Sequence, residues 1–316
     1  MFDSWYYYME FNNYLDRTIF IPQLSEGDKI FHYTSAAGIQ GISNGEFWVT
    51  EKSFLNDYTE FQVATDAFCE MLKLHMKDKR KCRVIQKKVR DEVNYLQETS
   101  LTTESRLSYD GDYVISFCLE DDSPLMWSSY SDHAGYCIQF DYNKFKKAIY
   151  KNFKWSCFDG RVIYNRTEQI ECLERTIKKE FFDEPEYGYL NTWDDLDNMS
   201  DDNIKNWKLH MSVIILLYNM FFKLPCFEGE HEYRFVLSAP HDGGIHKLKE
   251  YCNQGFRIKD EVLIPYITVG VDIDSIEKVI IGSKNKSDMA VRGLQCLFRN
   301  LKHDIKVEKS SIPLRY

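Results

Sequence analysis

Four short stretches of the chain carry side chains whose types and spacing are suited to chemistry. They are Phe31-His32-Tyr33-Thr34-Ser35, Leu55–Glu60, Ser123–Tyr130 and Glu228–Arg234. On a strand, His32 and Thr34 share one face, where an imidazole and a hydroxyl can both hydrogen-bond to a bound ribose. The alternative for His32 is a buried core histidine that is bonded to a backbone carbonyl.

The last of these stretches holds two carboxylates and a guanidinium within five residues. A strand over 230–237 predicts that Glu230, Glu232 and Arg234 project from one face. Charges on a half-buried strand are unfavourable unless they are paired or functional. A cross-strand ion ladder accounts for Arg234, whereas two adjacent like charges indicate a candidate site. Glu232 is the preferred catalytic residue because it lies deeper in the apolar strand, and Glu230 is the second candidate.

The other two stretches have the pattern of helix starts. Asn56 or Asp57 caps the first helix, and Glu60 completes a capping box. Tyr58 lies in the first turn, where its ring can project over whatever lies beside His32. In the other stretch, residues 127 and 130 are three apart and share a helix face. They either pack as core or place Tyr130 against a ligand, and a buried phenol needs a hydrogen-bond partner.

Hydrophobic periodicity predicts the elements that must position these residues. Strands are expected at 29–34, 47–50, 113–119, 135–141, 160–164, 230–237, 262–271, 276–281 and 305–310. Helices are expected at 36–44, from 61 onward through the basic segment 73–90, after Ser123-Pro124, across 165–222 and at 289–301. This irregular order predicts one α+β domain over 1–316, with a basic helical insertion around 61–110 and an acidic one around 165–222. The sequence has no glycine-rich loop of the Rossmann or P-loop kind.

Composition excludes several classes of protein. The chain has 316 residues, 44% of them apolar and 28% charged, which rules out wholesale disorder. Its longest apolar stretch, 211–222, is too short to span a membrane, and the N-terminus lacks the basic region of a secretory signal. Most of the nine cysteines stand in apolar stretches, and no Cys-x-x-Cys occurs. We therefore expect free thiols, a cytoplasmic location and no metal site.

The charges of the chain are concentrated in two blocks. Residues 73–90 contain nine Lys or Arg, and residues 181–203 contain eight acids without Lys or Arg. Lys73–Arg90 is a candidate surface for RNA or single-stranded DNA, and a solvated helix face is the alternative. The acidic block 181–203 is a candidate docking surface for a basic partner protein.

Taken together, the four stretches resemble a bacterial family of uncharacterised cytosolic proteins. The shared signature consists of His32–Thr34, Leu55–Glu60, Ser116–Cys118 with Met126–Tyr130, Glu230–Arg234 and Val279–Gly282. This resemblance spans about residues 29–284 and implies no activity by itself.

Residues 31–60 also resemble, more distantly, the opening of ADP-ribosyltransferases of the His-Tyr-Glu type. The matches are His32, Thr34, the short helix with Gly45, Trp48 and Tyr58, with Glu230 or Glu232 on a late strand. The sequence departs from that family at Tyr33, where those enzymes have glycine.

That resemblance implies an ADP-ribosyltransferase-like mixed sheet and an enzyme that uses NAD as substrate without a metal. His32, Tyr33, Thr34, Tyr58 and Tyr130 would bind NAD, and Glu232 or Glu230 would act with His32 in one cleft. ADP-ribose would pass to a nucleic acid or a protein, and by analogy the chain would be a toxin or an anti-phage effector. The alternatives are an NAD glycohydrolase and a non-enzymatic nucleic-acid or protein binding module.

Overall fold

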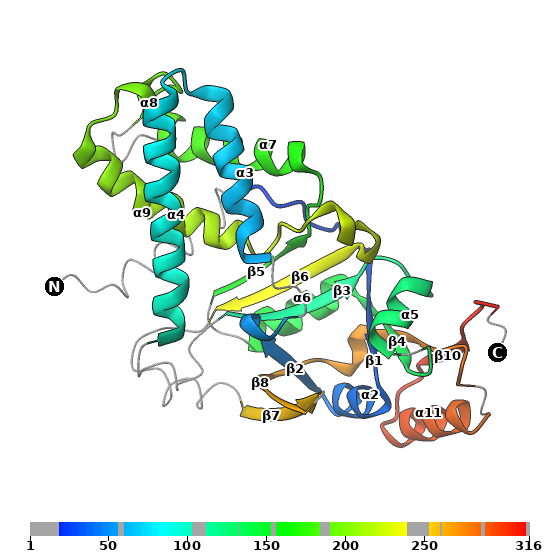
Figure 1. The fold of residues 1–316 in the computed structure, drawn as a ribbon. Helices are drawn as coiled ribbons and strands as arrows, with labels where there is room; N and C mark the ends of the chain where they lie inside the picture. The colour runs from blue at the N-terminus through cyan, green and yellow to red at the C-terminus, as the bar shows by residue number, and fades with distance from the viewer. Residues whose placement is uncertain are drawn as a thin grey trace. The chain divides into compact units, whose positions relative to one another are not determined.

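The computed structural model describes nine segments of the chain (Figure 1). They are residues 19–55, 60–102, 112–131, 133–152, 156–183, 190–238, 253–259, 261–285 and 288–313. The chain divides into two compact units. The helical unit comprises 1–22, 56–110 and 162–228, and the sheet unit comprises 23–55, 111–161 and 229–316. Both of the insertions predicted from the sequence belong to the helical unit.

The sheet unit is built on a mixed sheet in which three arms meet at β3 (Asp112–Cys118). One arm contains β1 (Lys29–Thr34), β4 (Tyr136–Asp141), β9 (Ile276–Ile281) and β10 (Lys306–Lys309). A second arm contains β2 (Glu46–Glu51), β8 (Val262–Gly270) and β7 (Asn253–Lys259). The third contains β6 (Glu232–Ser238) and β5 (Ser156–Arg161). The described strand pairs are antiparallel except β9–β10, so the prediction of helices around a mixed sheet is confirmed.

The first two arms separate along one edge of β3. Cys118 pairs with Phe31 of β1, while Val114 pairs with Thr50 of β2. Residues 115–117 have no partner in either ladder on that edge, although they pair with β6 on the other. The sheet therefore forks over the middle of β3.

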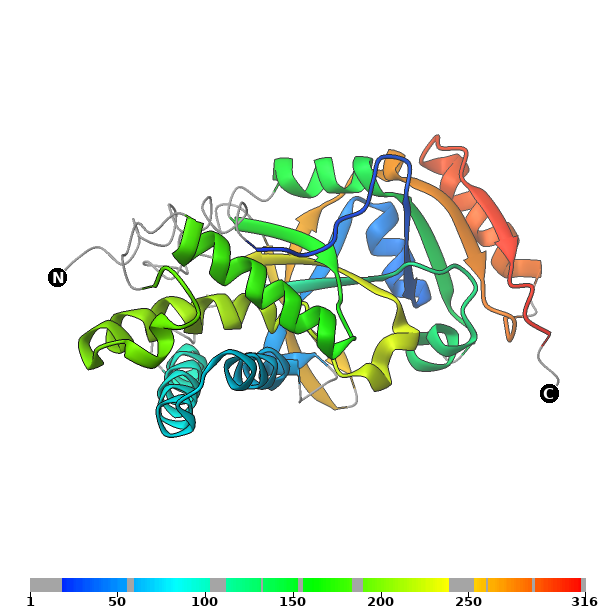
Figure 2. The same cartoon turned by 90° about the horizontal axis from the view of Figure 1, so that it is seen from above.

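Helices cover both faces of this sheet. On one face α5 (Pro124–Ser131) packs against β1, and its first residue is the proline expected there. On the other face α6 (Tyr142–Asn152) brings Phe145 against Phe117 and Phe235. Figure 2 shows the two helices on opposite sides of the strands. We call these two surfaces the α5 face and the α6 face.

Two further helices of the sheet unit were both expected. Ser35 caps α2 (Ala36–Ser43) by accepting a hydrogen bond from the Gly38 N–H. Gly45 follows this helix with φ of 85°, the left-handed conformation that ends many helices. The amphipathic helix predicted near the C-terminus is α11 (Asp288–Asn300), which buries Leu294 and Phe298.

The helical unit packs four long helices around one apolar core. They are α3 (Glu60–His75), α4 (Lys79–Thr102), α7 (Arg166–Ile177) and α9 (Asp201–Tyr218), with the short α8 (Asp195–Asn198). The six-residue segment η3 (Lys178–Asp183) follows α7 in a wider helical turn. Cys82, Ile85, Val89 and Val93 line the buried side of α4 at helical spacing. Phe68 of α3 and Trp207 of α9 fill the centre of this core.

The sequence predicts one continuous helix through the basic segment 73–90, but the structure has two helices there. The chain leaves the helix after His75, and α4 starts at Lys79. Asp78 causes the break because its carboxylate accepts hydrogen bonds from the backbone N–H groups of Arg80 and Lys81. A competing cap inside a helical pattern thus divides one predicted helix into two.

Two elements were missed and two strands were misplaced. Helix α6 and strand β7 were not predicted, since the first is short and rich in lysine and the second has little alternation. The strand expected at 160–164 is β5, four residues earlier, and the strand expected from Glu230 starts at Glu232.

Within the described residues, no helix is both long and apolar enough to cross a membrane. The eight cysteines that the structure describes are free thiols, and six of them are buried. Their burial agrees with the expectation that they serve as small apolar side chains.

Candidate functional site

Three of the four sequence motifs come together on the α5 face. Phe31 and Tyr33 of β1, Cys118 of β3 and Trp127 of α5 form one buried cluster. The rings of Tyr33 and Trp127 meet edge to face, with centroids 4.9 Å apart and planes at 84°. The pairing of Cys118 with Glu232 brings the start of β6 to the same place.

The hydroxyl of Tyr33 organises the loop that follows β3. It donates to the carbonyl of Glu120 (3.2 Å) and accepts from the N–H of Ser123 (2.8 Å). Burial and the neighbouring Cys137 raise the pKa of Tyr33 above its ordinary value, so the phenol stays protonated. The side chain of Tyr33 is thus used within the protein, where it fixes β1 against the start of α5.

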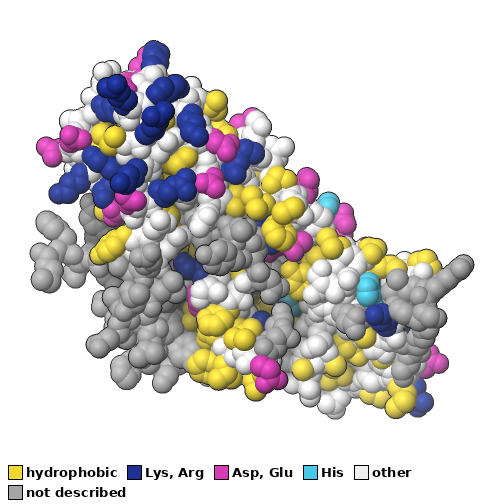
Figure 3. Space-filling model, viewed as in Figure 1, with side chains coloured by type: hydrophobic (Ala, Val, Ile, Leu, Met, Phe, Trp, Pro, Cys, Tyr) yellow, Lys and Arg dark blue, Asp and Glu magenta, His cyan; other side chains and the backbone are white. Residues whose placement is uncertain are grey.

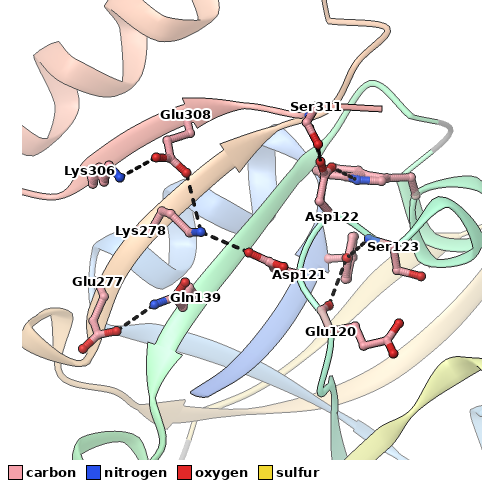
Figure 4. Close-up of polar contacts among 12 residues, drawn as sticks. Glu120, Asp121, Asp122, Ser123, Gln139, Glu277, Lys278, Lys306, Glu308 and Ser311 are labelled. Carbon is pink, nitrogen blue, oxygen red and sulfur yellow. Dashed lines mark hydrogen bonds and ion pairs between the residues drawn. The ribbon is translucent and has the colours of Figure 1, made fainter. Parts of the chain in front are cut away.

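Asp122 completes this loop in a left-handed conformation, with φ of 51°. Its carboxylate accepts from Trp127 Nε1 (2.8 Å). It also accepts from the backbone N–H of Ser311 (2.7 Å), and Figure 4 shows Ser311 beside Asp122. Burial raises the pKa of Asp122, but hydrogen bonds from Ser310, Ser311 and Trp127 outweigh it and lower the net value. The loop between β3 and α5 is therefore held by hydrogen bonds at both ends.

Glu232 and Arg234 form a buried ion pair beside this cluster. Arg234 Nε donates to Glu232 Oε1 (2.6 Å) and Nη2 donates to Oε2 (3.0 Å), so the pair is bidentate. The two side chains are 6% and 2% exposed. Cys118 and Ser116 face them across the β3–β6 ladder, which places the pair on the α5 face. Arg234 is therefore paired within its own strand and not, as the sequence alternative had it, in an ion ladder across strands.

Glu230 does not lie on the strand, contrary to the sequence prediction. It ends the short helix η4 (Pro225–Glu230), and His231 follows with φ of 44°. A non-glycine residue in that region breaks the alternation that would align Glu230 with Glu232. Glu230 Oε1 instead accepts from the hydroxyl of Tyr130 (3.3 Å), and both side chains remain partly exposed.

His231 itself joins the two ends of this corner. Its carbonyl accepts from the N–H of Leu119 (2.8 Å), and its Nδ1 lies 3.4 Å from Glu120 Oε1. Burial raises the pKa of the nearby Cys118 thiol to about 11, to which the charges of Glu120 and Glu230 add. Cys118 is therefore not a nucleophile at neutral pH.

His32 lies on the opposite face, so its predicted convergence with Glu232 in one cleft is wrong. Alternation along β1 turns His32 away from Tyr33, and its ring packs between Phe47 and Phe117 on the α6 face. His32 Nδ1 donates to the carbonyl of Ser116 (3.1 Å), a group in the fork of the sheet. Burial and, to a smaller extent, the charge of Arg257 lower the pKa of His32 to about 4, against the opposing effect of the hydrogen bond to Ser116. His32 is thus the neutral, carbonyl-bonded histidine that was its structural alternative.

The remaining predicted ligands divide as follows. Thr34 lies at the end of β1 against Gly38, where an added Cβ would meet its hydroxyl at 2.0 Å, so it packs against α2. Tyr58, with Asn56 and Asp57, lies outside the described residues. The structure brings Tyr33, Tyr130, Glu230 and Glu232 together and leaves His32 and Thr34 on the α6 face.

Asp159 of β5 is a second buried carboxylate, and it lies outside the four sequence motifs. It accepts hydrogen bonds from the hydroxyls of Tyr142 (2.6 Å), Tyr150 (2.7 Å) and Tyr233 (2.5 Å), and Lys146 Nζ lies 2.9 Å away. Burial lowers the pKa of Lys146, but Asp159 outweighs it and raises the net value. This network is internally satisfied, and it belongs to the packing of α6.

Comparison with known proteins finds similarity to one family model, which carries no activity. A family model described as a protein of unknown function (DUF2971) matches residues 126–235, from α5 to the middle of β6. That range contains Tyr130, Glu230 and Glu232 but not Tyr33. No curated protein and no solved structure matches the chain.

Proposed function

We propose that the chain cleaves the nicotinamide–ribose bond of NAD and transfers ADP-ribose to an acceptor, at the corner formed by Glu230, Tyr130 and the Glu232–Arg234 pair. The resemblance to ADP-ribosyltransferases suggests the substrate. The observation that carries the assignment is Glu230, a partly exposed carboxylate held by the Tyr130 phenol beside a buried ion pair. It replaces Glu232 as the preferred catalytic residue, because Arg234 engages both oxygens of Glu232.

The chemistry fits a carboxylate in this position. As the bond between ribose C1′ and the nicotinamide nitrogen breaks, its electron pair neutralises the pyridinium and C1′ becomes oxocarbenium-like. A fixed carboxylate stabilises that positive charge. A hydroxyl of the acceptor then attacks C1′, and its proton passes to solvent. Water as the acceptor makes the same site an NAD glycohydrolase, which remains the alternative.

The remaining residues of the corner support Glu230 without contacting C1′. The Tyr130 hydroxyl donates to Glu230 and fixes the position of its carboxylate. The Glu232–Arg234 pair fixes the first residues of β6, and His231 sets the direction in which Glu230 projects. These are positioning roles.

Release of nicotinamide from NAD tests the proposal. Glu230→Gln should reduce the rate by ~10²-fold or more while leaving the melting temperature unchanged, since the amide keeps the shape and loses the charge. Glu46→Gln, which alters an exposed carboxylate on β2, is the matched control and should retain the rate. Mass spectrometry of the products separates transfer from hydrolysis. A full rate in Glu230→Gln, or no nicotinamide release by the unaltered chain, would refute the proposal.

A second candidate function is binding of single-stranded nucleic acid by the helical unit. Arg80, Arg83 and Lys87 follow one another at spacings of three and four on α4, and all three are exposed. Figure 3 shows Lys and Arg side chains gathered over this unit. Lys79 and Lys81 are less suitable, because their ammonium groups donate to the carbonyls of Met76 and Asp197.

The acidic block is used within the same unit. Lys77 pairs with Asp194 (2.8 Å) and Lys88 with Asp201 (3.2 Å), so acids of the block already face the basic segment. The backbone N–H groups of residues 77 and 78 also donate to Asp197. We therefore place the proposed nucleic-acid surface on the Arg80–Arg83–Lys87 stripe, and a docking role of the acidic block has less support.

A further inference from the structure

Arg257 of β7 is a partly buried cation whose hydrogen bonds are incomplete. Its Nη2 donates to Thr50 Oγ1 of β2 at 2.8 Å, reaching across β8. Its Nε is buried and has no acceptor in the described part of the chain. A guanidinium has five N–H donors, and a buried donor without an acceptor is unfavourable. If this arginine were purely structural, the protein would be expected to supply an oxygen that accepts a hydrogen bond from Nε.

Within the described residues, the positive charge of Arg257 also has no carboxylate partner. Burial lowers the pKa of Arg257, and the charge of Tyr266 opposes that shift. The same charge depresses the pKa of His32 across the fork. Arg234, by contrast, has a bidentate carboxylate partner. A buried charge without a counter-ion is costly, so the local structure favours an anion from outside.

An aromatic platform stands beside this cation. Trp48 of β2 and Tyr266 of β8 stack with centroids 4.6 Å apart and planes at 17°, and Trp48 is 38% exposed. Gly255 allows the Tyr266 ring to lie flat, because a Cβ there would meet the ring at 2.6 Å. Trp48 thus remains partly exposed two residues from Thr50, the hydrogen-bond partner of Arg257, and an aromatic ring near a cation is how proteins hold planar groups that carry phosphate.

The cation and the carboxylate corner share the α5 face. Thr50 pairs with Val114 on one edge of β3, and Glu232 pairs with Cys118, four residues further along, on the other edge. About 14 Å along the strand and about 10 Å across two strand spacings put the two ends roughly 17 Å apart. Ser116 lies between them on the same face and is partly exposed. One extended ligand of two linked nucleosides can therefore reach both ends.

We propose that Arg257 and Thr50 bind a phosphate of a nucleoside diphosphate and that Trp48 stacks on its base. A planar fork with free donors matches a phosphate, which would supply the acceptors and the negative charge that the protein does not. If the proposed function is correct, this ligand is the ADP half of NAD, with its ribosyl-nicotinamide end at Glu230. Only that identification rests on the proposed function.

Calorimetric titration with ADP and with pyrophosphate tests the site. The unaltered chain should bind both, and Arg257→Gln should weaken both by about tenfold to a hundredfold, the value of a charge-assisted hydrogen bond. Trp48→Ala should weaken ADP severalfold and leave pyrophosphate unchanged. Arg292→Gln, an exposed arginine of α11, is the matched control and should bind normally.

Thermal melting distinguishes a ligand site from a structural arginine. Without ligand, Arg257→Gln should melt at the same or a higher temperature, because it removes an uncompensated charge. A lower melting temperature with unchanged ADP affinity, or no ADP binding by the unaltered chain, would overturn the site. Nicotinamide release reports separately on the proposed function. ADP binding without nicotinamide release would support the Arg257 site and refute the proposed transferase. Nicotinamide release without ADP binding would support the transferase and refute the Arg257 site.

Discussion

The two units of the chain differ in the exposure of their ion pairs. In the helical unit, pairs that join the basic and acidic segments are exposed, as in Lys88–Asp201, whose side chains are 39% and 92% exposed, although Glu180 and Lys223 are buried. The sheet unit also has exposed pairs, such as Lys309–Asp288, but it buries both members of the Glu232–Arg234 pair and Asp159, whose side chain is fully enclosed. Exposed pairs contribute little free energy, whereas buried charges demand partners.

Because of this difference, an unpaired charge is evidence for a ligand site only where it is buried. At the surface of the helical unit, a charge without a partner is only hydrated, so exposed acids and bases indicate long-range attraction at most. In the sheet unit, each buried charge must be compensated. Glu232 and Asp159 are, and Arg257 is not, within the described residues. Measuring how much buried and exposed pairs contribute to the free energy of unfolding tests this contrast.

The largest effect is expected from the buried pair. Glu232→Gln should lower the free energy of unfolding by about 3–5 kcal/mol, because Arg234 remains buried without a counter-charge. Chemical denaturation measures this loss, and Glu46→Gln should show almost none. Replacing both partners by methionine should recover most of the loss. A stable Glu232→Gln variant would mean that Arg234 draws its compensation from elsewhere.

Sequence alone could predict most elements of the sheet unit, because local signals suffice for them. The serine cap and Gly45 define α2, and Pro124 opens α5. The candidate site was only half predictable. The direction of Glu230 depends on a left-handed His231, and neither its neighbours nor their period indicates that conformation. Likewise the fork, which separates His32 from Glu232, arises from pairings distant in sequence.

A smaller effect should appear as a pH dependence. The pKa of His32 is about 4 in the folded protein and near 6.5 in the unfolded chain. Between pH 6.5 and 4, His32 is therefore protonated in the unfolded chain but mostly neutral in the folded protein. Stability should fall as pH drops from 6.5 to 4, by at most about 3 kcal/mol, and should not depend on His32 above that window.

Urea denaturation of the unaltered chain and of His32→Gln at several pH values measures this contribution. The glutamine amide keeps a donor for the Ser116 carbonyl and cannot titrate. The variant should therefore lose less stability across the window than the unaltered chain. Parallel curves for the two proteins would show that His32 is protonated as easily in the fold as outside it.

A smaller change still is expected at the surface of α4. Reversing Arg80, Arg83 and Lys87 to glutamate should weaken binding of single-stranded RNA by about tenfold or more and flatten its salt dependence. Three lost phosphate contacts correspond to a change of about 2 in the slope of log K against log salt. Reversal of Lys147, Lys151 and Lys302 in the sheet unit is the charge-matched control. Equal losses in both triples would assign the effect to net charge alone.

The smallest effect separates two pairs that both join α4 to α9. Lys208 contacts Glu92 with both side chains mostly buried, whereas Lys88 and Asp201 are largely exposed. Lys208→Gln should lower the free energy of unfolding by about 1 kcal/mol, and Lys88→Gln by less than about 0.5 kcal/mol. High salt should abolish the second loss and leave most of the first, because buried pairs are screened less. Denaturation at two salt concentrations measures both. If the two variants lose the same free energy and respond alike to salt, burial does not govern the strength of charge pairs in this unit.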